Sequence, residues 1–289
     1  MKKILFIDNY KIFKNWASKT YEYKINEIRK DENFHYFDID DDINNINIKN
    51  YDTVIFGWNM TYISKYYTLK RDFYLKYVKD LETDIQIKNF ILPFMDIKNK
   101  YLIIQDFNCN HDYLNGLNGL TKFLIDNKIN NIITPYLKNN GIEKIKKNIK
   151  NINIIHMQHH INSNYFKNWK LEKKYDIFIF GNISKKFYPF RWRLYNLLKK
   201  YQDDLNILFW EGIRNYFKFK KNISNENLSK CINKSWITIC TSSKFKLVLG
   251  KYMETSMSGS VICGDLPEDG KDTWKGNMIE INENMTDDQ

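Results

Sequence analysis

The sequence has few cysteines and few prolines, 4 of each among 289 residues. Cys109, Cys231, Cys240 and Cys263 are scattered along the chain, with neither a CxxC pair nor the spacing of a metal site. The last three fall within apolar patterns typical of helices or strands. This distribution predicts buried free thiols and a reducing compartment, and it argues against a disulfide framework.

Long apolar runs are also absent. No stretch approaches the ~20 residues that a transmembrane helix needs. The first ten residues, MKKILFIDNY, carry charge but have an apolar core of only about five residues, against ~7–15 in a signal peptide. We therefore expect a cytoplasmic protein, in the host cytoplasm if the source is viral.

Hydrophobic residues make up 43% of the chain and aromatic residues 16%, which is ample material for packed cores, and the length indicates two domains. Lys and Arg number 45 against 34 Asp and Glu, for a net charge of +11. Such an excess is compatible with nucleic acid, an anionic membrane surface or a phosphate-bearing substrate. The abundance of Lys, Asn and Ile also indicates A/T-rich codons, so part of the charge is expected on solvated faces without a partner.

Strand-like apolar runs alternate with helical stretches through the first half of the chain. The strand-like runs cover 3–8, 33–39, 52–58, 101–107, 131–137 and 152–158, and the helical stretches cover 16–30, 65–81 and 117–127. Strands separated by helices imply crossover connections and a mainly parallel sheet. In such a sheet, ligands bind at the carboxyl ends of the strands.

A second series of strands and helices follows an aperiodic connection over 159–176. Its strand-like runs cover 176–181, 205–210, 236–241, 260–264 and 277–281, and its helices cover 189–201, 225–233 with Ser224 as N-cap, and a stretch that ends at Gly259. The sequence thus predicts two Rossmann-like α/β domains, 1–165 and 166–289. Only NENMTDDQ follows the last strand, so we expect either a truncated second domain or a compact variant without a terminal helix.

Basic residues gather where the first strand of the second domain leads into a helix. Gly181 ends the strand and lets the backbone approach a ligand, and Pro189 suits the first helical turn. The cations around this junction are Lys185, Lys186, Arg191 and Arg193. A strand-to-helix junction with such charges favours an anionic group, and Arg191 lies nearest the helix start. Solvation of each charge remains the alternative.

The stretch KYMETSMSGSVICGD, residues 251–265, reads as a helix, a glycine turn at Gly259 and a short strand. Glu254 lies on the helix before the turn, and its carboxylate is suited to accept hydrogen bonds from the two hydroxyls of a ribose. Lys251 precedes Glu254 by one turn and is suited to phosphate oxygens. A surface ion pair between Glu254 and a lysine remains the alternative.

The segments YDIFIFGNISKKFYPFRWRLYNLL and GKYMETSMSGSVICGD resemble the second half of GT-B-fold glycosyltransferases, in particular the CgeB-like branch of group 1. The shared features are a glycine after the first strand, a Tyr-Pro-x-Arg element and a basic-x-x-Glu helix followed by a Gly-x-hydrophobic turn and strand. The similarity covers roughly 176–281, and the first domain matches only in its α/β alternation.

The resemblance implies two Rossmann-like domains that face each other across a cleft, with a nucleotide-diphosphate sugar bound by the second. Glu254 would hold the ribose, Lys251 and Arg191 would face the diphosphate, and Gly181 would allow close approach. Lys185 and Gly259 complete the expected donor site. The reaction would need no metal, because cations stabilise the departing diphosphate. Larger relatives carry a second, earlier glutamate, and that position is Lys246 here.

The first domain is then expected to bind the acceptor, which is a glycan, protein or lipid hydroxyl. QDFNCNHDYLNG follows the strand over 101–107, on the crevice side. His111 titrates near neutral pH and is the candidate base or orienting group, with Asp112 beside it and Asp106 as a weaker candidate. A histidine that only packs or caps a loop is the alternative.

Other patterns are less specific. HMQHH at 156–160 lacks a further metal ligand at suitable spacing, and FDIDDD at 37–42 reads as an acidic loop. The basic stretch 138–151 is compatible with anionic lipid or polymer, or with a solvated face. The rival functions are a catalytically silent nucleotide- or carbohydrate-binding module and, more remotely, a nucleic-acid binder, although no nucleic-acid module is recognisable. The pattern does not indicate an oligomeric state.

Overall fold

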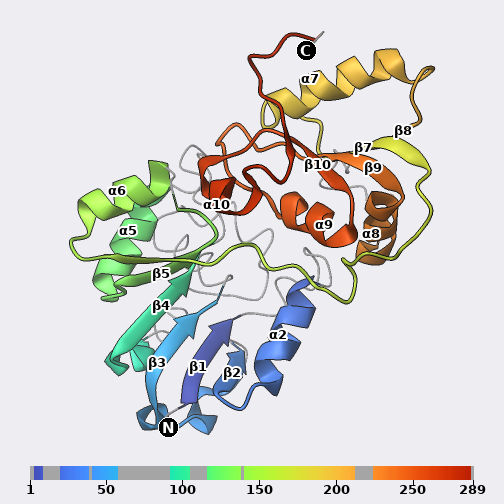
Figure 1. The fold of residues 1–289 in the computed structure, drawn as a ribbon. Coiled ribbons are helices and arrows are strands. Elements are labelled where there is room, and N and C mark those ends of the chain that lie inside the picture. Colours follow the sequence, from blue (N-terminus) through green and yellow to red (C-terminus); the bar gives the residue numbers. More distant parts are fainter. Residues whose placement is uncertain are drawn as a thin grey trace, which may run out of the picture. The chain divides into compact units, whose positions relative to one another are not determined.

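The computed structural model describes residues 3–8, 20–38, 41–57, 92–104, 116–137, 140–211 and 224–287. The chain divides into two compact units, Met1–Gln158 and His159–Gln289, and Figure 1 shows a sheet and helices in each. The division precedes the predicted boundary at 165 because Ile161, Tyr165 and Phe166 pack into the core of the second unit.

The first unit contains a six-stranded parallel sheet in the order β2-β1-β3-β4-β5-β6. Its strands are β1 (Lys3–Asp8), β2 (Phe34–Asp38), β3 (Tyr51–Phe56), β4 (Asn99–Ile103), β5 (Asn131–Thr134) and β6 (Asn153–His156). Its described α-helices are α2 (Thr20–Lys30), α5 (Gly116–Asp126) and α6 (Asn140–Asn148). Leu5 and Ile7 of β1 are fully buried and Phe6 is 3% exposed, which explains the continuous apolar run of this strand, since both of its faces are covered.

The second unit contains a five-stranded parallel sheet in the order β11-β10-β9-β7-β8. Its strands are β7 (Tyr175–Gly181), β8 (Ile207–Glu211), β9 (Ser235–Ile239), β10 (Val261–Gly264) and β11 (Ile279–Glu280). Its α-helices are α7 (Pro189–Leu198), α8 (Asn225–Asn233), α9 (Gly250–Ser258) and α10 (Lys271–Trp274). The predicted fold class, two Rossmann-like α/β domains in tandem, is confirmed in each unit.

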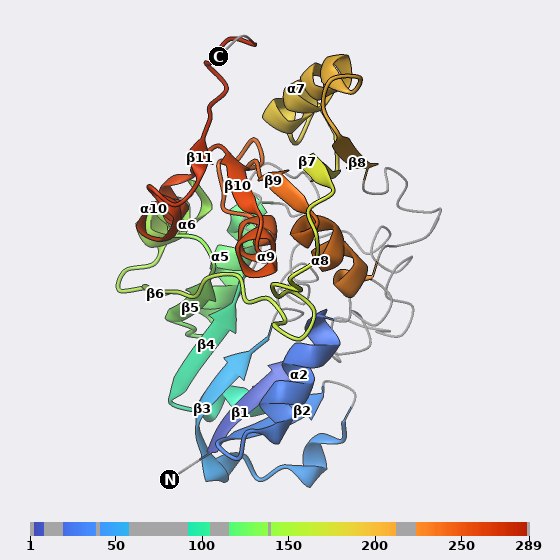
Figure 2. The same cartoon turned by 45° about the vertical axis from the view of Figure 1, so that its right-hand side comes forward.

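Helices cover the second sheet from both faces. Figure 2 shows α7 on one side of the strands and α8 and α9 on the other. Tyr195 of α7 packs with Ile179 and Ile239, whereas Ile232 of α8 packs with Phe178, so neighbouring residues of β7 enter opposite cores. The predicted cap of α8 is confirmed, because the Ser224 side chain accepts a hydrogen bond from the Asn227 amide.

The strand order places a topological switch point between β7 and β9. The chain leaves β7 toward β8 on one side and then returns to form β9 on the other side of β7. At such a point the loops after the two central strands run in opposite directions, so the carboxyl ends of the strands are open to a ligand. In this unit those ends are Gly181 and Ile239.

Several predicted elements are shorter in the structure. The strand predicted over 277–281 is only Ile279–Glu280, and the helix predicted over 189–201 ends at Leu198 and continues as a 3-10 turn. The helix predicted over 65–81 lies outside the described residues.

None of the helices in the described part of the chain has the length and apolar character of a membrane span. Cys231, Cys240 and Cys263 are free thiols, as predicted, although only Cys240 is fully buried, and Cys109 lies outside the described residues.

Candidate functional site

Gly181 lies at the centre of the candidate site in the second unit. It ends β7 with a φ of 100°, a conformation that side-chain-bearing residues rarely adopt. A Cβ added to Gly181 would lie 3.2 Å from Nη1 of Arg191 and 3.6 Å from Nζ of Lys251. The absent side chain therefore lets two cations converge on the end of the strand.

Arg191 joins the ends of β7 and β9. It lies in the first turn of α7 and is only 2% exposed. Its Nε donates to Thr241 Oγ1 at 3.0 Å, its Nη2 to the Thr241 carbonyl at 2.9 Å and its Nη1 to the Asn182 carbonyl at 3.2 Å. The guanidinium also stacks 4.2 Å above the centre of the Tyr188 ring. These contacts fix the cation across the switch point.

Lys251 approaches the same place from α9. It is 7% exposed, and its ammonium donates to the Phe180 carbonyl at 2.8 Å and lies 4.2 Å above the centre of the Phe180 ring. Burial, and next the charge of Arg191, hold the pKa of Lys251 well below its usual range. Helix α9 begins at Gly250, so Lys251 is its second residue and lies at the carboxyl-terminal edge of the sheet, where the helix starts.

Arg191 and Lys251 are thus two buried cations that neutral groups hold in place. Within the described residues neither forms an ion pair with a carboxylate, and their hydrogen bonds go to backbone carbonyls and one hydroxyl. Leu249 offers no side-chain cap to α9, whose first amide groups add positive potential at this edge. Like charges that are buried together destabilise a fold. Glu254 acts on Lys251, and Asp265 on Arg191, only from beyond ion-pair distance, so a bound anion lowers the penalty further.

Glu254 is the carboxylate of this group of residues. It is half-buried, and its Oε1 lies 4.0 Å from the position that a Cβ on Gly250 would occupy. No described residue donates a hydrogen bond to it. Burial raises the pKa of Glu254 to about 7, and the charge of Lys251 partly opposes this increase. The carboxyl group therefore lies near the buried cations and accepts no hydrogen bond from a described residue.

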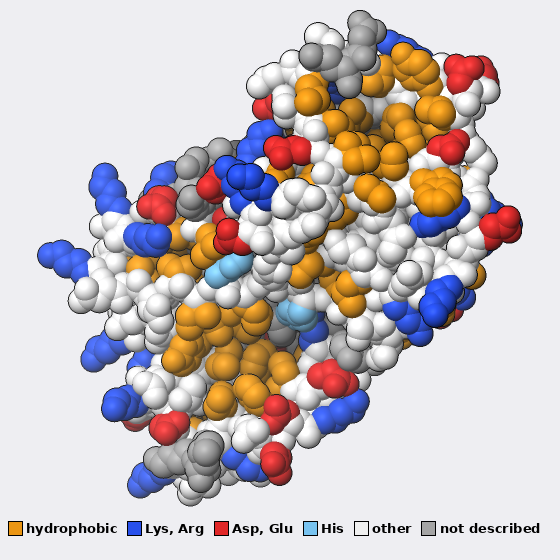
Figure 3. Space-filling view, viewed as in Figure 1, with side chains coloured by type: hydrophobic (Ala, Val, Ile, Leu, Met, Phe, Trp, Pro, Cys, Tyr) orange, Lys and Arg blue, Asp and Glu red, His pale blue; other side chains and the backbone are white. Residues whose placement is uncertain are grey.

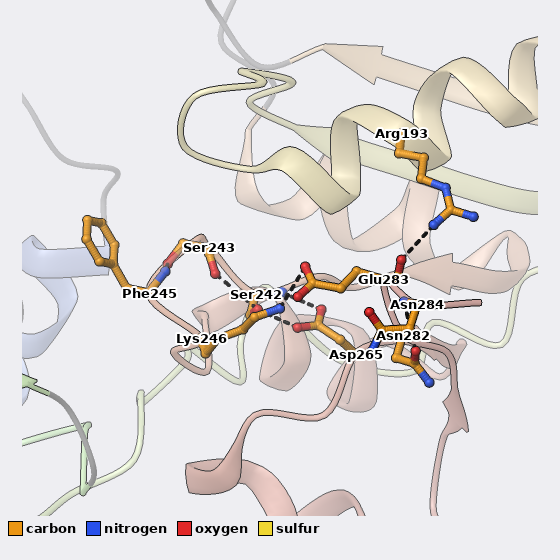
Figure 4. Close-up of polar contacts among 9 residues, drawn as sticks. All are labelled: Arg193, Ser242, Ser243, Phe245, Lys246, Asp265, Asn282, Glu283 and Asn284. Atoms are coloured by element: carbon orange, nitrogen blue, oxygen red, sulfur yellow. Dashed lines mark hydrogen bonds and ion pairs between the residues drawn. The ribbon is translucent and has the colours of Figure 1, made fainter. Parts of the chain in front are cut away.

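The loops after β9, β10 and β11 are tied together at the same edge, as Figure 4 shows. The Ser242 amide donates to Asp265 Oδ1 at 2.8 Å, and the Ser242 hydroxyl also donates to this carboxylate. Lys246 forms an ion pair of 3.1 Å with Glu283, whose carbonyl accepts a hydrogen bond of 2.8 Å from Arg193. The segment after β11 thereby connects the loop after β9 to α7.

The structure brings together four of the six predicted donor-site residues, which are Gly181, Arg191, Lys251 and Glu254. Lys185 does not join them, because it is exposed and its ammonium lies 4.6 Å above the centre of the Trp192 ring.

Gly259 is also separate from this group. It has the predicted left-handed conformation at the C-terminus of α9, with a φ of 74°. However, it precedes β10 and so lies at the amino-terminal edge of the sheet, where a Cβ would meet the Asn168 side chain at 3.0 Å. Its conformation ends the helix, and the structure gives it no place among the residues at the carboxyl ends of the strands.

Sequence reasoning missed Thr241 and Asn182, which supply the acceptors for Arg191. Both directly follow apolar strand patterns, which is the one signal that would have identified them. It also missed Asp8, the fully buried last residue of β1 in the first unit. A Cβ on Gly57 would lie only 2.3 Å from Asp8 Oδ2, so this glycine makes room for the carboxylate at the end of the strand.

The predicted acceptor-side residues cannot be placed. His111, Asp112 and Asp106 lie outside the described residues. Within the described ranges no group of three His, Cys, Asp or Glu side chains could hold a metal ion. Of the HMQHH stretch, His156 contacts the Pro135 carbonyl and His159 contacts the Val248 carbonyl, both at 3.2 Å through Nε2.

Comparison with known proteins gives only distant similarities. No protein-family model matches the sequence, and no curated protein does. The crystal structure of the GtfA/B complex aligns with a TM-score of 0.42 and 13% identity over 69% of this chain and 45% of that one. The pneumococcal O-GlcNAc transferase GtfA in complex with UDP and GlcNAc aligns with a TM-score of 0.42 and 14% identity, over 70% and 45%.

This chain therefore spans less than half the length of these two structures. Similarity at this distance does not identify a ligand or a reaction for this chain. The CgeB-like resemblance stays a prediction.

Proposed function

We propose that the protein is a glycosyltransferase that transfers a sugar from a nucleotide-diphosphate sugar to a hydroxyl acceptor without a metal ion. The observation that carries this proposal is the pair of buried cations, Arg191 and Lys251, that converge on Gly181 at the switch point without a carboxylate partner. A diphosphate supplies negative charge at this place. In the proposed reaction the bond between the anomeric carbon and the diphosphate breaks, and the nucleoside diphosphate leaves with the electron pair. The acceptor oxygen bonds to that carbon and loses its proton to a base.

Each part of a donor has a chemically suited partner in the second unit. The diphosphate fits Arg191, Lys251 and the first amides of α9, since fixed cations and a helix N-terminus stabilise charge on a leaving group as a metal does. The ribose hydroxyls fit Glu254, which lacks a described donor. We propose that the acceptor, a glycan, protein or lipid hydroxyl, is activated from the first unit, with His111 as base and Asp112 beside it.

The free thiols of the second unit favour a reducing compartment, and we assign the activity to the cytoplasm.

A catalytically silent nucleotide-binding module is the second candidate. The observation in its favour is Lys246, which stands where larger relatives of the resembled family carry a glutamate and which pairs with Glu283.

The affinity for nucleotide is expected to rise with pH, because only ionised Glu254 accepts two hydroxyl hydrogen bonds. Its pKa in the free protein is about 7. Below this pH a proton must leave before the ribose binds, so affinity should be about tenfold higher at pH 8 than at pH 6. Calorimetric titration across this range measures the slope.

Glu254→Gln is the matched control, because it keeps the shape of the side chain but does not titrate. Titration of the nucleotide phosphate affects both proteins equally, so the difference between them isolates the carboxylate. A wild-type profile parallel to that of Glu254→Gln would remove the ribose assignment.

The same residue raises an expectation for folding. The pKa of Glu254 is higher in the folded protein than its ordinary value of 4.5, so folding favours the protonated form. Its contribution to the free energy of unfolding is present below pH 4.5 and is lost as the pH rises to about 7. Ligand-free Glu254→Gln should therefore gain stability relative to wild type over this interval.

Product formation tests the proposed reaction. Wild-type protein is incubated with a panel of nucleotide-diphosphate sugars, with and without a metal chelator, and release of the nucleoside diphosphate is followed. We expect release from one donor class that persists with chelator and falls in Glu254→Ala, by about 10–100-fold for the loss of charge-assisted hydrogen bonds. Nucleotide binding without release from any donor would favour the silent module, and release only with metal would contradict the metal-free mechanism.

A further inference from the structure

Lysines gather on the first unit at the amino-terminal edge of its sheet. Lys98, Lys128 and Lys150 lie in the turns that lead into β4, β5 and β6, which are neighbours in the sheet, and all three are exposed. These turns lie at the opposite edge of the sheet from the carboxyl ends where parallel sheets bind their ligands.

Helix α6 adds to this charge. Ile142 and Ile145 face the core and are fully buried, whereas Lys144 and Lys147 are exposed on the outer side. Within the described residues neither Lys144 nor Lys147 forms an ion pair. The lysine surface, as we define it, comprises Lys98, Lys122, Lys128, Lys144, Lys146, Lys147 and Lys150.

Few carboxylates balance the lysine surface. Asp126 is paired with Lys122 at 2.8 Å and Glu143 with Lys146 at 3.3 Å, so these pairs neutralise each other. Asp96, which precedes β4, and Asp52, at the start of the neighbouring β3, are further exposed acids at this edge near Lys98. Figure 3 shows Lys and Arg side chains projecting along the side of the first unit where α5 and α6 lie in Figure 1.

An apolar side chain stands within this surface. Ile125 of α5 is 52% exposed, and it lies three residues from both Lys122 and Lys128. Lysine stems reach toward a charged layer while an exposed aliphatic group enters the apolar boundary below the headgroups. A single exposed isoleucine is common on protein surfaces, so it supports the inference only through its position between Lys122 and Lys128.

We infer that the lysine surface binds the headgroups of an anionic lipid membrane. In α5, α6 and the described turns into β4, β5 and β6, every cation is a lysine, and no exposed residue is aromatic. Nucleic-acid surfaces favour arginine, whose planar fork pairs with phosphate, and aromatic rings, on which bases stack. Lysine ammonium groups on flexible side chains are instead suited to a diffuse layer of anionic headgroups. The inference is independent of the proposed sugar transfer.

Vesicle flotation tests the inference with phosphatidylcholine alone and with added phosphatidylserine, at several salt concentrations. Wild-type protein is expected to float only with the phosphatidylserine vesicles and to dissociate as salt rises. A variant with Lys128, Lys144, Lys147 and Lys150 changed to Gln should bind at least about 100-fold more weakly, since each lysine near such a surface contributes about fivefold.

The matched control changes Lys170, Lys174, Lys200 and Lys275 of the second unit to Gln. These lysines are exposed as well, so net charge falls by the same amount. The control should float like wild type. Equal losses in both variants, or no flotation of wild type at physiological salt, would overturn the inference. Binding of a single-stranded oligonucleotide that the first variant alone loses, without vesicle binding, would assign the surface to nucleic acid instead.

Discussion

Replacing Lys251 by methionine is expected to weaken the binding of a nucleoside diphosphate by about 30-fold or more, without lowering the stability of the protein. The ammonium is buried beside Arg191 and forms no ion pair with a described carboxylate, although the charge of Glu254 acts on it from a greater distance. Methionine has a similar length and no charge, so it removes both the interaction with phosphate and the penalty of burying a second cation. The relief of that penalty offsets the loss of the donor to the Phe180 carbonyl. Replacement of buried charges by apolar groups is often neutral or stabilising by about 1–4 kcal/mol.

The stability of Lys251→Met should also differ from that of wild type in its pH dependence. Folding holds the pKa of Lys251 well below its usual 10.5, so the folded protein releases this proton before the unfolded chain does. The contribution of Lys251 to stability therefore improves as the pH rises through its folded pKa toward 10.5. Lys251→Met should lack that improvement.

Denaturant unfolding at several pH values and calorimetric titration with the nucleotide measure both effects. Lower stability of Lys251→Met with unchanged affinity would show that the lysine holds the fold together, and it would contradict its assignment to phosphate.

Replacing Arg191 by alanine is expected to lower the free energy of unfolding by about 3 kcal/mol or more, and to abolish nucleotide binding as well. The change leaves the Thr241 carbonyl and hydroxyl and the Asn182 carbonyl without their donor. An unsatisfied buried polar group costs about 1–3 kcal/mol, and the loss of the guanidinium also separates the ends of β7 and β9. Urea unfolding measures the difference.

Arg193→Ala is the matched control in the same helix. Arg193 is half-buried and binds the segment after β11, through the Glu283 carbonyl and an ion pair of 2.8 Å with Asp287. Because this pair is largely exposed, its removal should lower stability by no more than about 1 kcal/mol. Equal losses in Arg191→Ala and Arg193→Ala would contradict the bridging role of Arg191.

The two arginines also show what the sequence could predict. Their position at a strand-to-helix junction follows from the apolar strand before them and from Pro189, which begins α7. Their different partners do not follow, because Thr241 and Asp287 are distant in the sequence and meet α7 only after the sheet has formed. Local pattern therefore predicted the elements and the edge on which Arg191 lies, and tertiary contacts decided which cation faces the site.

Gly259 illustrates the same division. Its conformation was predictable from a helix that ends before a strand, and the φ of 74° confirms it. Its assignment to the donor site rested on the resemblance, in which a Gly-x-hydrophobic turn follows the basic-x-x-Glu helix. A helix of nine residues, however, carries the chain from one edge of the sheet to the other, so residues at its two ends serve different edges.

The resemblance placed Lys251 and Arg191 at the same diphosphate, but nothing in the sequence indicated that both would be buried. Each alone reads as a surface cation, and their burial depends on Gly181, which removes the side chain that would separate them from the strand end. A fold that buries two such charges, with carboxylates only beyond ion-pair distance, gives up stability at this place, as functional sites commonly do. This is the physical basis for assigning an anionic ligand to the second unit.

The most direct measurement of this claim is thermal unfolding of wild type and Lys251→Met with nucleoside diphosphates of each base, and with the corresponding nucleosides, in the presence of a metal chelator. A ligand at 100 times its dissociation constant adds about 2.7 kcal/mol to the free energy of unfolding. We predict a rise in melting temperature for wild type with one diphosphate, a much smaller rise with its nucleoside, and for Lys251→Met a rise no more than about a third of that of wild type, as expected for 30-fold weaker binding. Equal shifts in both proteins, or no shift of wild type with any diphosphate, would contradict the assignment of this site to a nucleotide diphosphate.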